Sequence, residues 1–290
     1  METLRHLIYY VIAPDPEDRM VRQWTQSIRS LRRYSPESPV HLLHCGPLSS
    51  SLMSEAERNN AVVHELPEYP ALLAEHTPHW RTLAAYPTFH KLLCLDRLPF
   101  DRVGKLLYLD CDTYWFAQPK RLFDNYRTCD FYACAEVGSR AFRDWHELDW
   151  YDPTYLDEDL LVAISAAEGL SMVSPFNTGV MLLQSTLCQR LLSLRNRFLE
   201  TAARLLAGNP RSCNPPSVVP LVYPSNNDWI LDEVALWLTL GAIPEMKQGI
   251  LDRRDVPIGN LHVGAPRERR LLAHYFSVQE EEFFRHHPRL

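Results

Sequence analysis

The chain has 290 residues, of which 46% are hydrophobic, and its formal net charge is −6 at pH 7. Its length and composition suffice for a sizeable buried core, while the negative balance argues against nucleic acid as the main partner, because phosphate binding needs a concentrated basic surface. No window reaches the roughly 18 apolar residues that span a bilayer, and the first residues lack a small-residue cleavage site, so we expect a cytoplasmic protein without a transmembrane segment. The seven cysteines form no Cys-x-x-Cys pair, which indicates reduced thiols and no zinc site.

The first part of the chain alternates strand and helix signals. Residues 7–13 form an apolar, β-rich run, residues 20–34 carry apolar side chains at helical spacing, and apolar runs return at 40–45 and 61–66. Strands that alternate with helices favour a parallel sheet, and ligands of such sheets bind beyond the carboxyl ends of the strands. We therefore predict a Rossmann-like first half.

The next predicted strand ends in two aspartates. Residues 88–98 are predicted to form a helix, and the apolar run at 105–109 is followed directly by Asp110-Cys111-Asp112. In an extended chain, residues i and i+2 project to the same side, so the two carboxylates converge and repel each other. A divalent cation with oxygen ligands would neutralise them most simply. In the alternative interpretation, Asp112 caps the next element and Asp110 accepts backbone hydrogen bonds.

The remainder of the chain carries further strand and helix signals around an unusual central segment. Residues 143–161 interleave aromatic and acidic side chains, which is poor core material and indicates either a binding loop or a solvated insertion. Residues 209–223 are rich in Pro, Ser and Asn, which marks a loop rather than a domain linker. The apolar patterns predict strands at 131–137 and 173–183 and helices at 187–206 and 228–240.

Four short segments, taken in their order along the chain, carry a resemblance to a known family. These are Phe-His-Lys-Leu-Leu at 89–93, Leu-Tyr-Leu-Asp-Cys-Asp-Thr at 107–113, Phe-Asn-Thr-Gly-Val-Met at 176–181, and Leu-Asp-Glu-Val-Ala-Leu at 231–236. Together they resemble retaining glycosyltransferases of the glycogenin type, the family 8 group. The resemblance implies an α/β protein with the GT-A fold, a Rossmann-like fold for nucleotide-diphospho-sugar transfer built on a central mixed sheet.

The same resemblance implies a domain organisation and an activity. We expect a single GT-A domain over residues 1–290, with a nucleotide-binding half at about 1–115, an acceptor-side half at about 116–265 and a C-terminal extension at 266–290. The expected enzyme is a metal-dependent hexosyltransferase, which moves the sugar from UDP with retention of anomeric configuration. Its acceptor, whether glycan, lipid-linked sugar, protein or small molecule, is unidentified, and the segment 144–155 is the candidate acceptor-binding loop.

The resemblance also implies a metal site, in which Asp110 and Asp112 bind Mn²⁺ or Mg²⁺ at the diphosphate of the UDP-sugar, with Cys111 between them in the donor-binding set. A histidine near the C-terminus supplies a further ligand in the family, within the pattern His-x-x-Gly-x-x-Lys-Pro-Trp, and the candidate here is His262. That pattern is only partly kept, since Gly264 follows by two residues instead of three. A cation with hard oxygen ligands would stabilise the departing UDP.

Further donor contacts follow by position. In place of the family's phosphate-binding lysine, this sequence offers Arg267 or Arg269, whose guanidinium groups can clasp phosphate oxygens. Lys91 matches the lysine that reaches the donor. Ala13, at the end of the first predicted strand, is a candidate contact with uracil.

The residues expected around the donor sugar come from the third and fourth segments. Asn177 and Gly179 would border the sugar, because Asn can bond its hydroxyls and Gly permits close backbone approach. Asp232 would bond donor hydroxyls. Glu233 would lie at the reacting face, where the family has Gln, and a carboxylate there could act as a nucleophile or stabilise an oxocarbenium-like centre.

Two other functions fit part of this pattern. A sugar nucleotidyltransferase of similar architecture would need a glycine-rich, basic loop after its first strand, whereas residues 14–18 read Pro-Asp-Pro-Glu-Asp. A non-catalytic nucleotide-sugar-binding protein on a GT-A scaffold is the second alternative, because a fold alone does not establish activity.

Overall fold

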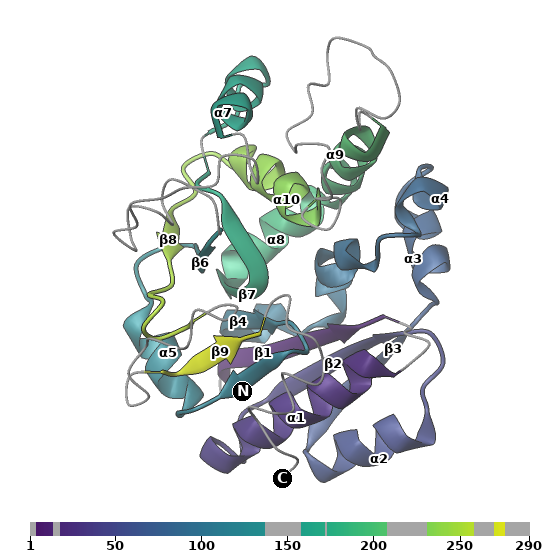
Figure 1. The fold of residues 1–290 in the computed structure, drawn as a ribbon, viewed down its shortest axis with the longest axis vertical. Helices are drawn as coiled ribbons and strands as arrows, with labels where there is room; N and C mark the ends of the chain where they lie inside the picture. The colour runs from purple at the N-terminus through teal and green to yellow at the C-terminus, as the bar shows by residue number, and fades with distance from the viewer. Residues whose placement is uncertain are drawn as a thin grey trace.

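A mixed sheet organises the computed structural model of the chain, which describes residues 4–13, 18–136, 158–171, 173–207, 231–257 and 270–275. Among these residues, seven strands form the main sheet in the order β3-β2-β1-β4-β7-β6-β8, and β5 pairs with β9 in a second, two-stranded sheet (Figure 1). The strands are β1 Leu4–Ile12, β2 Val40–Cys45, β3 Ala61–Leu66, β4 Val103–Leu109, β5 Thr113–Trp115, β6 Phe131–Ala135, β7 Phe176–Gln184, β8 Gln248–Ile250 and β9 Leu272–His274.

The sheet has a parallel part and an antiparallel insertion. Strands β3, β2, β1 and β4 are parallel, as the alternating strand and helix signals predict. Strand β7 then runs antiparallel to both of its neighbours, β4 and β6. The predicted Rossmann-like first half and the predicted central mixed sheet are therefore both confirmed.

Helices cover the two faces of this sheet. The α-helices are α1 Arg19–Tyr34, α2 Ser50–Arg58, α3 Tyr69–His76, α4 Trp80–Leu83, α5 Pro119–Asn125, α7 Glu158–Ala167, α8 Ser185–Ser193, α9 Arg195–Ala207 and α10 Leu231–Gly241, and the 3₁₀ turns are η1 Pro87–Leu92, η2 Leu95–Arg97 and η3 Phe100–Arg102. Figure 1 shows α1 and α2 on one side of the parallel strands and α8, α9 and α10 on the other. None of the helices in the described part of the chain is long and apolar enough to cross a membrane.

The central strands are buried on both faces, which explains their nearly continuous apolar runs. Along β1, Leu7, Tyr9 and Val11 belong to one hydrophobic core, which also contains side chains of α8, α9 and α10. Ile8 and Tyr10 belong to a second core, which contains side chains of α1, α2 and α5. Successive side chains of a strand point to opposite faces of the sheet, so each central strand contributes residues to both cores.

Several predicted boundaries match the structure and two predicted helices do not. The strands predicted at 40–45 and 61–66 coincide with β2 and β3. The helix predicted at 88–98 is instead a series of 3₁₀ turns. Four consecutive residues, 92–95, are buried there, a pattern wider than the single stripe of an amphipathic helix. The helix predicted at 187–206 is two helices, interrupted at Leu194.

Candidate functional site

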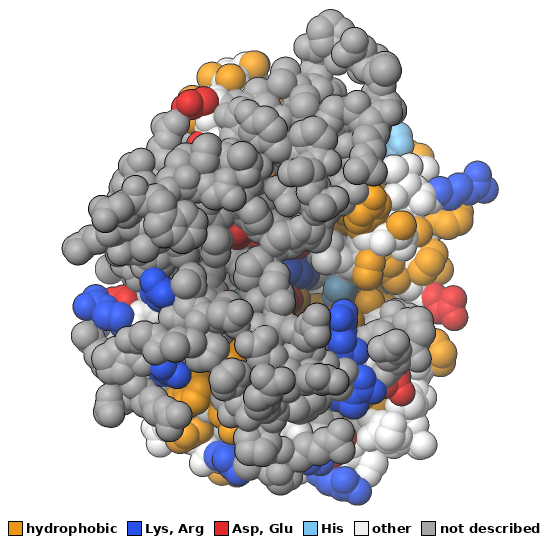
Figure 2. All heavy atoms as spheres, viewed as in Figure 1, with side chains coloured by type: hydrophobic (Ala, Val, Ile, Leu, Met, Phe, Trp, Pro, Cys, Tyr) orange, Lys and Arg blue, Asp and Glu red, His pale blue; other side chains and the backbone are white. Residues whose placement is uncertain are grey.

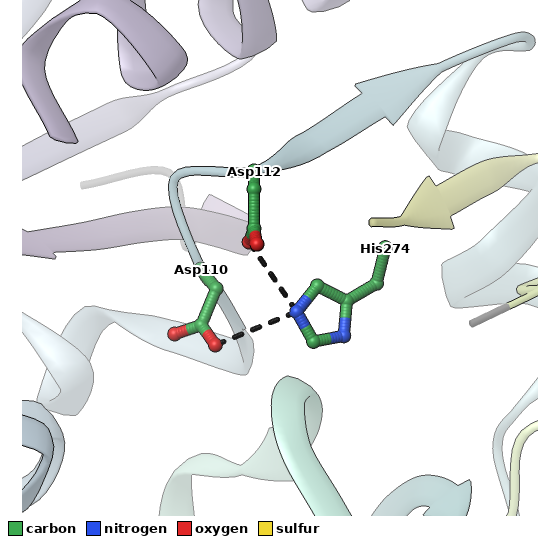
Figure 3. A group of neighbouring side chains, drawn as sticks. All are labelled: Asp110, Asp112 and His274. Carbon is green, nitrogen blue, oxygen red and sulfur yellow. Dashed lines mark ion pairs between the residues drawn. The ribbon is translucent and has the colours of Figure 1, made fainter. Parts of the chain in front are cut away.

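Two carboxylates and one imidazole converge where β4 ends (Figure 3). Asp110 and Asp112 lie in the turn between β4 and β5, and His274 is the last residue of β9. The Nε2 atom of His274 is 3.3 Å from Oδ1 of Asp112 and 3.6 Å from Oδ2 of Asp110. One ligand atom from each of the three side chains lies within 4.8 Å of the others, so they could hold one metal ion.

Backbone pairing fixes these three side chains relative to one another. Thr113 pairs with His274 in the antiparallel β5–β9 sheet, and the amide of Tyr275 donates to the carbonyl oxygen of Asp112 at 3.0 Å. The amide of Asp110 donates to the carbonyl oxygen of Gly179 at 2.8 Å, which ties the turn to β7. The site is thus built on strand ends and not on a free loop.

Gly179 makes room for the histidine. A Cβ atom on residue 179 would lie 1.9 Å from Cε1 of His274 and 2.4 Å from each ring nitrogen. No side chain larger than hydrogen fits there without displacing the imidazole. In the structure the group that approaches this glycine is the His274 ring, while its predicted place beside the donor sugar stays a prediction.

The charges in this cluster stabilise one another. Burial alone would lower the pKa of His274, but Asp112, through its charge and a hydrogen bond, and Asp110 together raise that pKa. Burial alone would raise the pKa of Asp112, and His274 more than offsets this, so the pKa of Asp112 is lowered. The structure therefore favours positive charge between the two aspartates. Two carboxylates with an imidazole are also a suitable ligand set for Mn²⁺.

Lys91 connects this cluster to the first turn of α10. Its Nζ lies 3.5 Å from Oδ1 of Asp110 and 3.3 Å from Oδ2 of Asp232, and it donates to Oγ1 of Thr178 at 2.7 Å. Burial would lower the pKa of Lys91, but Asp110, Asp232 and Glu233 raise it, so the ammonium stays charged. One half-buried ammonium group thus lies between two carboxylates.

The start of α10 faces β7 through a hydrogen-bonded network. Glu233 accepts hydrogen bonds at Oε1 from Nδ2 of Asn177 at 3.0 Å and from the amide of Thr178 at 3.1 Å. The hydroxyl of Thr178 donates to Oδ2 of Asp232 at 3.2 Å, because it already accepts from Lys91. Further along α10, Trp237 donates through Nε1 to the carbonyl oxygen of Phe176 at 2.9 Å. These contacts hold the acidic first turn of α10 against the third sequence segment.

Burial also raises the pKa values of the two acids in the first turn of α10, Asp232 and Glu233. The pKa of Asp232 is raised, chiefly by burial, although Lys91 opposes the shift. The pKa of Glu233 is raised well above its usual range by burial and by the neighbouring carboxyls of Glu136 and Asp232.

The structure brings most of the predicted site residues together. In the space-filling view, basic, acidic and histidine side chains lie recessed near the middle of the face (Figure 2). Ala13 is buried at the end of β1. The predicted residues joined by the contacts above are Lys91, Asp110, Asp112, Asn177, Gly179, Asp232 and Glu233.

Cys111 differs from its two neighbours in the turn. Its side chain is buried in the second hydrophobic core, and its Sγ approaches the carbonyl oxygen of Val11 at 3.8 Å. Burial raises the pKa of this thiol well above its usual range. Cys111 therefore packs the turn against β1 while the aspartates on either side of it face His274.

Four predicted features lie outside the described residues: His262, Arg267, Arg269 and the candidate acceptor loop 144–155. The histidine found beside the aspartates is His274, which the sequence analysis did not consider. Glu136 was also missed. Both follow apolar runs, 271–273 and 131–135 respectively, so the signal that identified Asp110, a polar residue directly after a buried strand, applies to them too.

Sheet order, mixed strand direction and the carboxylate turn after β4 define a GT-A fold, the fold of nucleotide-sugar-dependent glycosyltransferases. The chain is similar to an active-site mutant of LgtC, with a TM-score of 0.54, 14% sequence identity and coverage of 94% of this chain and 88% of that one. For the galactosyltransferase LgtC in complex with donor and acceptor sugar analogues, the TM-score is 0.50 at 14% identity, covering 93% and 87%. For the bifunctional glycosyltransferase WbbM it is 0.52 at 12% identity, covering 96% of this chain and 46% of that one.

These similarities concern three-dimensional structure alone. No protein-family model matches the sequence, and no curated protein matches it. At 12–14% identity the solved structures establish the fold. The assignment to family 8 stays a prediction from the four sequence segments.

Proposed function

We propose that this protein is a metal-dependent, retaining glycosyltransferase that transfers a hexose from a UDP-sugar to an acceptor. The observation that carries the proposal is the convergence of Asp110, Asp112 and His274 with the Lys91–Asp232 pair at the junction of β4 and β7. This position is beyond the carboxyl end of β4, where ligands of open α/β sheets bind. A galactosyltransferase of similar fold, LgtC, has been solved with donor and acceptor sugar analogues, which supports sugar transfer as the activity.

The diphosphate end of the donor is assigned to the three-residue cluster. Asp110, Asp112 and His274 would hold Mn²⁺ or Mg²⁺, and the bound ion would act as a Lewis acid that neutralises charge developing on the departing UDP. The raised pKa of His274 supports this assignment, since the two carboxylates already favour a positive charge at this place. Lys91 keeps its own charge and lies beside Asp110. It would add a second positive group near the leaving phosphate.

The sugar end is assigned to the network between β7 and α10. Asp232 is buried and is held by Lys91 and Thr178, so its carboxylate is oriented before any substrate binds. Asn177 is held by Glu233 and by the amide of Gly179. Carboxylate and amide groups fixed in this way bond sugar hydroxyls with little loss of side-chain entropy. Ala13 remains the proposed contact with uracil, at the end of β1.

Retention is proposed from the resemblance of the four sequence segments to a retaining family. Lys91 lies between Asp110 of the candidate metal site and Asp232, so the leaving group would lie beside this lysine. Glu233 follows Asp232 and accepts a hydrogen bond from Asn177. It would border the reacting centre of the sugar.

The test is nucleotide release from a panel of UDP-sugars, with a GDP-sugar for comparison, in Mn²⁺ or in EDTA. We expect Mn²⁺-dependent turnover of one donor by the native protein and its loss in Asp110→Asn/Asp112→Asn. Asp124→Asn is the matched control, because Asp124 is an acidic residue of α5 paired with Lys120 and Arg127 at the surface.

The three outcomes separate the candidate functions. Metal-dependent turnover supports the enzyme. Metal-dependent binding of UDP without turnover of any donor supports the non-catalytic binding protein. Absence of both, with a folded protein, contradicts the site assignment itself.

A further inference from the structure

Tyr108 is a buried residue of β4 that the proposed function leaves without a role. The residue is 1% exposed, and its hydroxyl donates a hydrogen bond to Oδ1 of Asp110 at 2.5 Å. In an extended chain, residues i and i+2 project to the same side, which brings the phenol of Tyr108 to the carboxylate of Asp110. Because a phenol is protonated at neutral pH, the hydroxyl donates and the carboxylate accepts, and hydrogen bonds of this type are short and strong.

The ring of Tyr108 is fixed by its neighbours in the core. Its Cα partners are Tyr9 on β1 and Met181 on β7, and all three side chains belong to the core that also contains α8, α9 and α10. The rings of Tyr9 and Tyr108 are tilted against each other, with their centroids 5.3 Å apart. Nζ of Lys91 lies 5.7 Å from the centroid of the Tyr108 ring. Close packing of this kind leaves a side chain one rotamer, so the hydroxyl is a fixed point beside Asp110.

The two oxygens of Asp110 therefore have different neighbours. Oδ1 accepts from Tyr108 and faces Nζ of Lys91 at 3.5 Å, whereas Oδ2 faces Nε2 of His274 at 3.6 Å. A carboxylate oxygen has two lone pairs, so the phenol and the ammonium group together occupy Oδ1. Oδ2 is the oxygen that Asp110 turns toward the histidine of the candidate metal site.

The number of oxygens that Asp110 offers affects which ion the site prefers. Ca²⁺ takes about six to eight oxygen ligands and often binds both oxygens of one carboxylate. Mg²⁺ and Mn²⁺ are bound with octahedral geometry, for which one oxygen from each carboxylate suffices. A carboxylate that is limited to one oxygen thus removes a contact that Ca²⁺ would use and that Mn²⁺ does not need.

We propose that Tyr108 is a positioning residue of the metal site: by holding Oδ1 it makes Asp110 a one-oxygen ligand, and the site then prefers Mn²⁺ to Ca²⁺. The position of Asp110 rests on the hydrogen bond from Tyr108. The preference between ions rests in addition on the metal site of the proposed function.

The first measurement is titration calorimetry with Mn²⁺ and with Ca²⁺ on the native protein and on Tyr108→Phe. The native protein should bind Mn²⁺ more tightly than Ca²⁺. In Tyr108→Phe the Mn²⁺ affinity should fall about 10–100-fold, as when a group that orients a metal ligand is lost. The Ca²⁺ affinity should fall less, because Oδ1 becomes available for a two-oxygen contact. A merely structural role of Tyr108 would lower both affinities by the same factor.

Tyr9→Phe is the matched control. Tyr9 is 0% exposed, lies against the ring of Tyr108, and has a buried hydroxyl without a hydrogen-bond partner in the described part of the chain. This variant should keep both affinities of the native protein. Equal losses for the two ions in Tyr108→Phe, or no loss for either, would overturn the proposal. Should Tyr108→Phe fail to fold, the native protein still decides the matter, since Ca²⁺ binding as tight as Mn²⁺ binding contradicts the preference.

The second measurement tests the hydrogen bond itself by urea unfolding without metal. The four proteins are the native chain, Tyr108→Phe, Asp110→Ala and the double variant. Asp110→Ala leaves the buried hydroxyl of Tyr108 without its acceptor, so the loss of stability in the double variant should be smaller than the sum of the two single losses. Additive losses would show that Tyr108 does not hold Asp110.

These measurements separate the inference from the proposed function. If the native protein binds Mn²⁺ but turns over no UDP-sugar, the proposed activity fails, and the comparison of ions still decides the role of Tyr108. If the native protein binds neither ion, the ion preference is overturned together with the metal site, and the urea cycle decides whether Tyr108 positions Asp110.

Discussion

Gly179 and His274 occupy one space: the imidazole of His274 lies where residue 179 would carry its Cβ atom, 1.9 Å from Cε1. The two residues come from β7 and β9, which belong to different sheets. The same glycine accepts a backbone hydrogen bond from Asp110 through its carbonyl oxygen. One small residue therefore determines the position of both an aspartate and the histidine of the candidate metal site.

Gly179→Ala should weaken metal binding far more than it weakens the fold. The methyl group displaces the imidazole from Asp112, and we expect Mn²⁺ affinity to fall about 10–100-fold, as when a group that orients a metal ligand is lost. Titration calorimetry with Mn²⁺ measures this directly. Gly169→Ala is the matched control, because its Cβ would meet open space while its φ of +65° still imposes a backbone penalty of about 1–2 kcal/mol. Equal Mn²⁺ affinity in the two variants would contradict the positioning role of Gly179.

Metal should stabilise the folded protein, and the effect should depend on Asp112. At a free Mn²⁺ concentration one hundred times its dissociation constant, linkage predicts about 2.7 kcal/mol of added stability. Thermal unfolding with Mn²⁺ and then with EDTA measures it. Asp112→Asn and His274→Asn should lose this dependence, and Asp124→Asn should keep it. A stabilisation by Mn²⁺ that survives both ligand variants would place the ion elsewhere.

Lys91→Met should destabilise the protein by about 3–5 kcal/mol, the usual cost of leaving a buried charge without its partner. The charge concerned is chiefly Asp232, whose side chain is 3% exposed. The double variant Lys91→Met/Asp232→Asn should recover much of that loss, because the orphaned carboxylate is gone. Urea unfolding of the native protein, the two single variants and the double variant gives the four unfolding free energies of a double-mutant cycle. Additive effects would show that the Lys91–Asp232 pair is not coupled.

Stability should fall steeply as the pH drops from about 6.5 to 4. Burial lowers the pKa of His41 to about 4, helped by His64, and burial also lowers the pKa of His90 to about 4. An unfolded histidine titrates near 6.5, so in this range the unfolded chain binds more protons and stability rises with pH.

His41→Gln tests this for one residue. Its ring donates or accepts a 2.7 Å hydrogen bond with His64, and we expect the loss of stability between pH 7 and pH 5 to shrink by about 1 kcal/mol, discounted for partial contact with solvent. The control is His79→Gln, at an exposed position. Unfolding free energies at the two pH values provide the comparison, and parallel curves for native protein and His41→Gln would disprove the assignment.

The fold was largely predictable because its strands are short, mostly apolar runs bounded by turn residues. Residues 40–45 end at Gly46-Pro47 and residues 61–66 end at Pro67, which marks where β2 and β3 end. The prediction for segment 88–98 was wrong because its composition is that of a helix. Phe89 and all of residues 92–95 are buried, which is wider than one helical stripe, and the chain forms short 3₁₀ turns there.

The site was predictable only where a motif was complete within one segment. The local sequence identifies Asp110 and Asp112 as candidate site residues, since two acids directly follow a buried strand. It does not identify His274 as their partner, because nothing near His274 in the sequence shows that β9 pairs with β5. Glu136 likewise is buried beside the start of β7, where its amide donates to the carbonyl oxygen of Pro175, and nothing local in the sequence shows that contact. Such pairings depend on tertiary structure, which residue spacing does not encode.

The pairing of β5 with β9 has a consequence for how the protein is made. Asp112 leaves the ribosome long before His274, although the two side chains meet in the native structure. Chains fold from the N-terminus as they are synthesised, so the parallel strands β1 to β4 can assemble while β9 is still absent. The two aspartates would then be present before their histidine partner, and the candidate metal site would be among the last parts of the molecule to form. Truncation after β8 should accordingly leave chains in which the parallel strands are folded but the candidate metal site lacks His274.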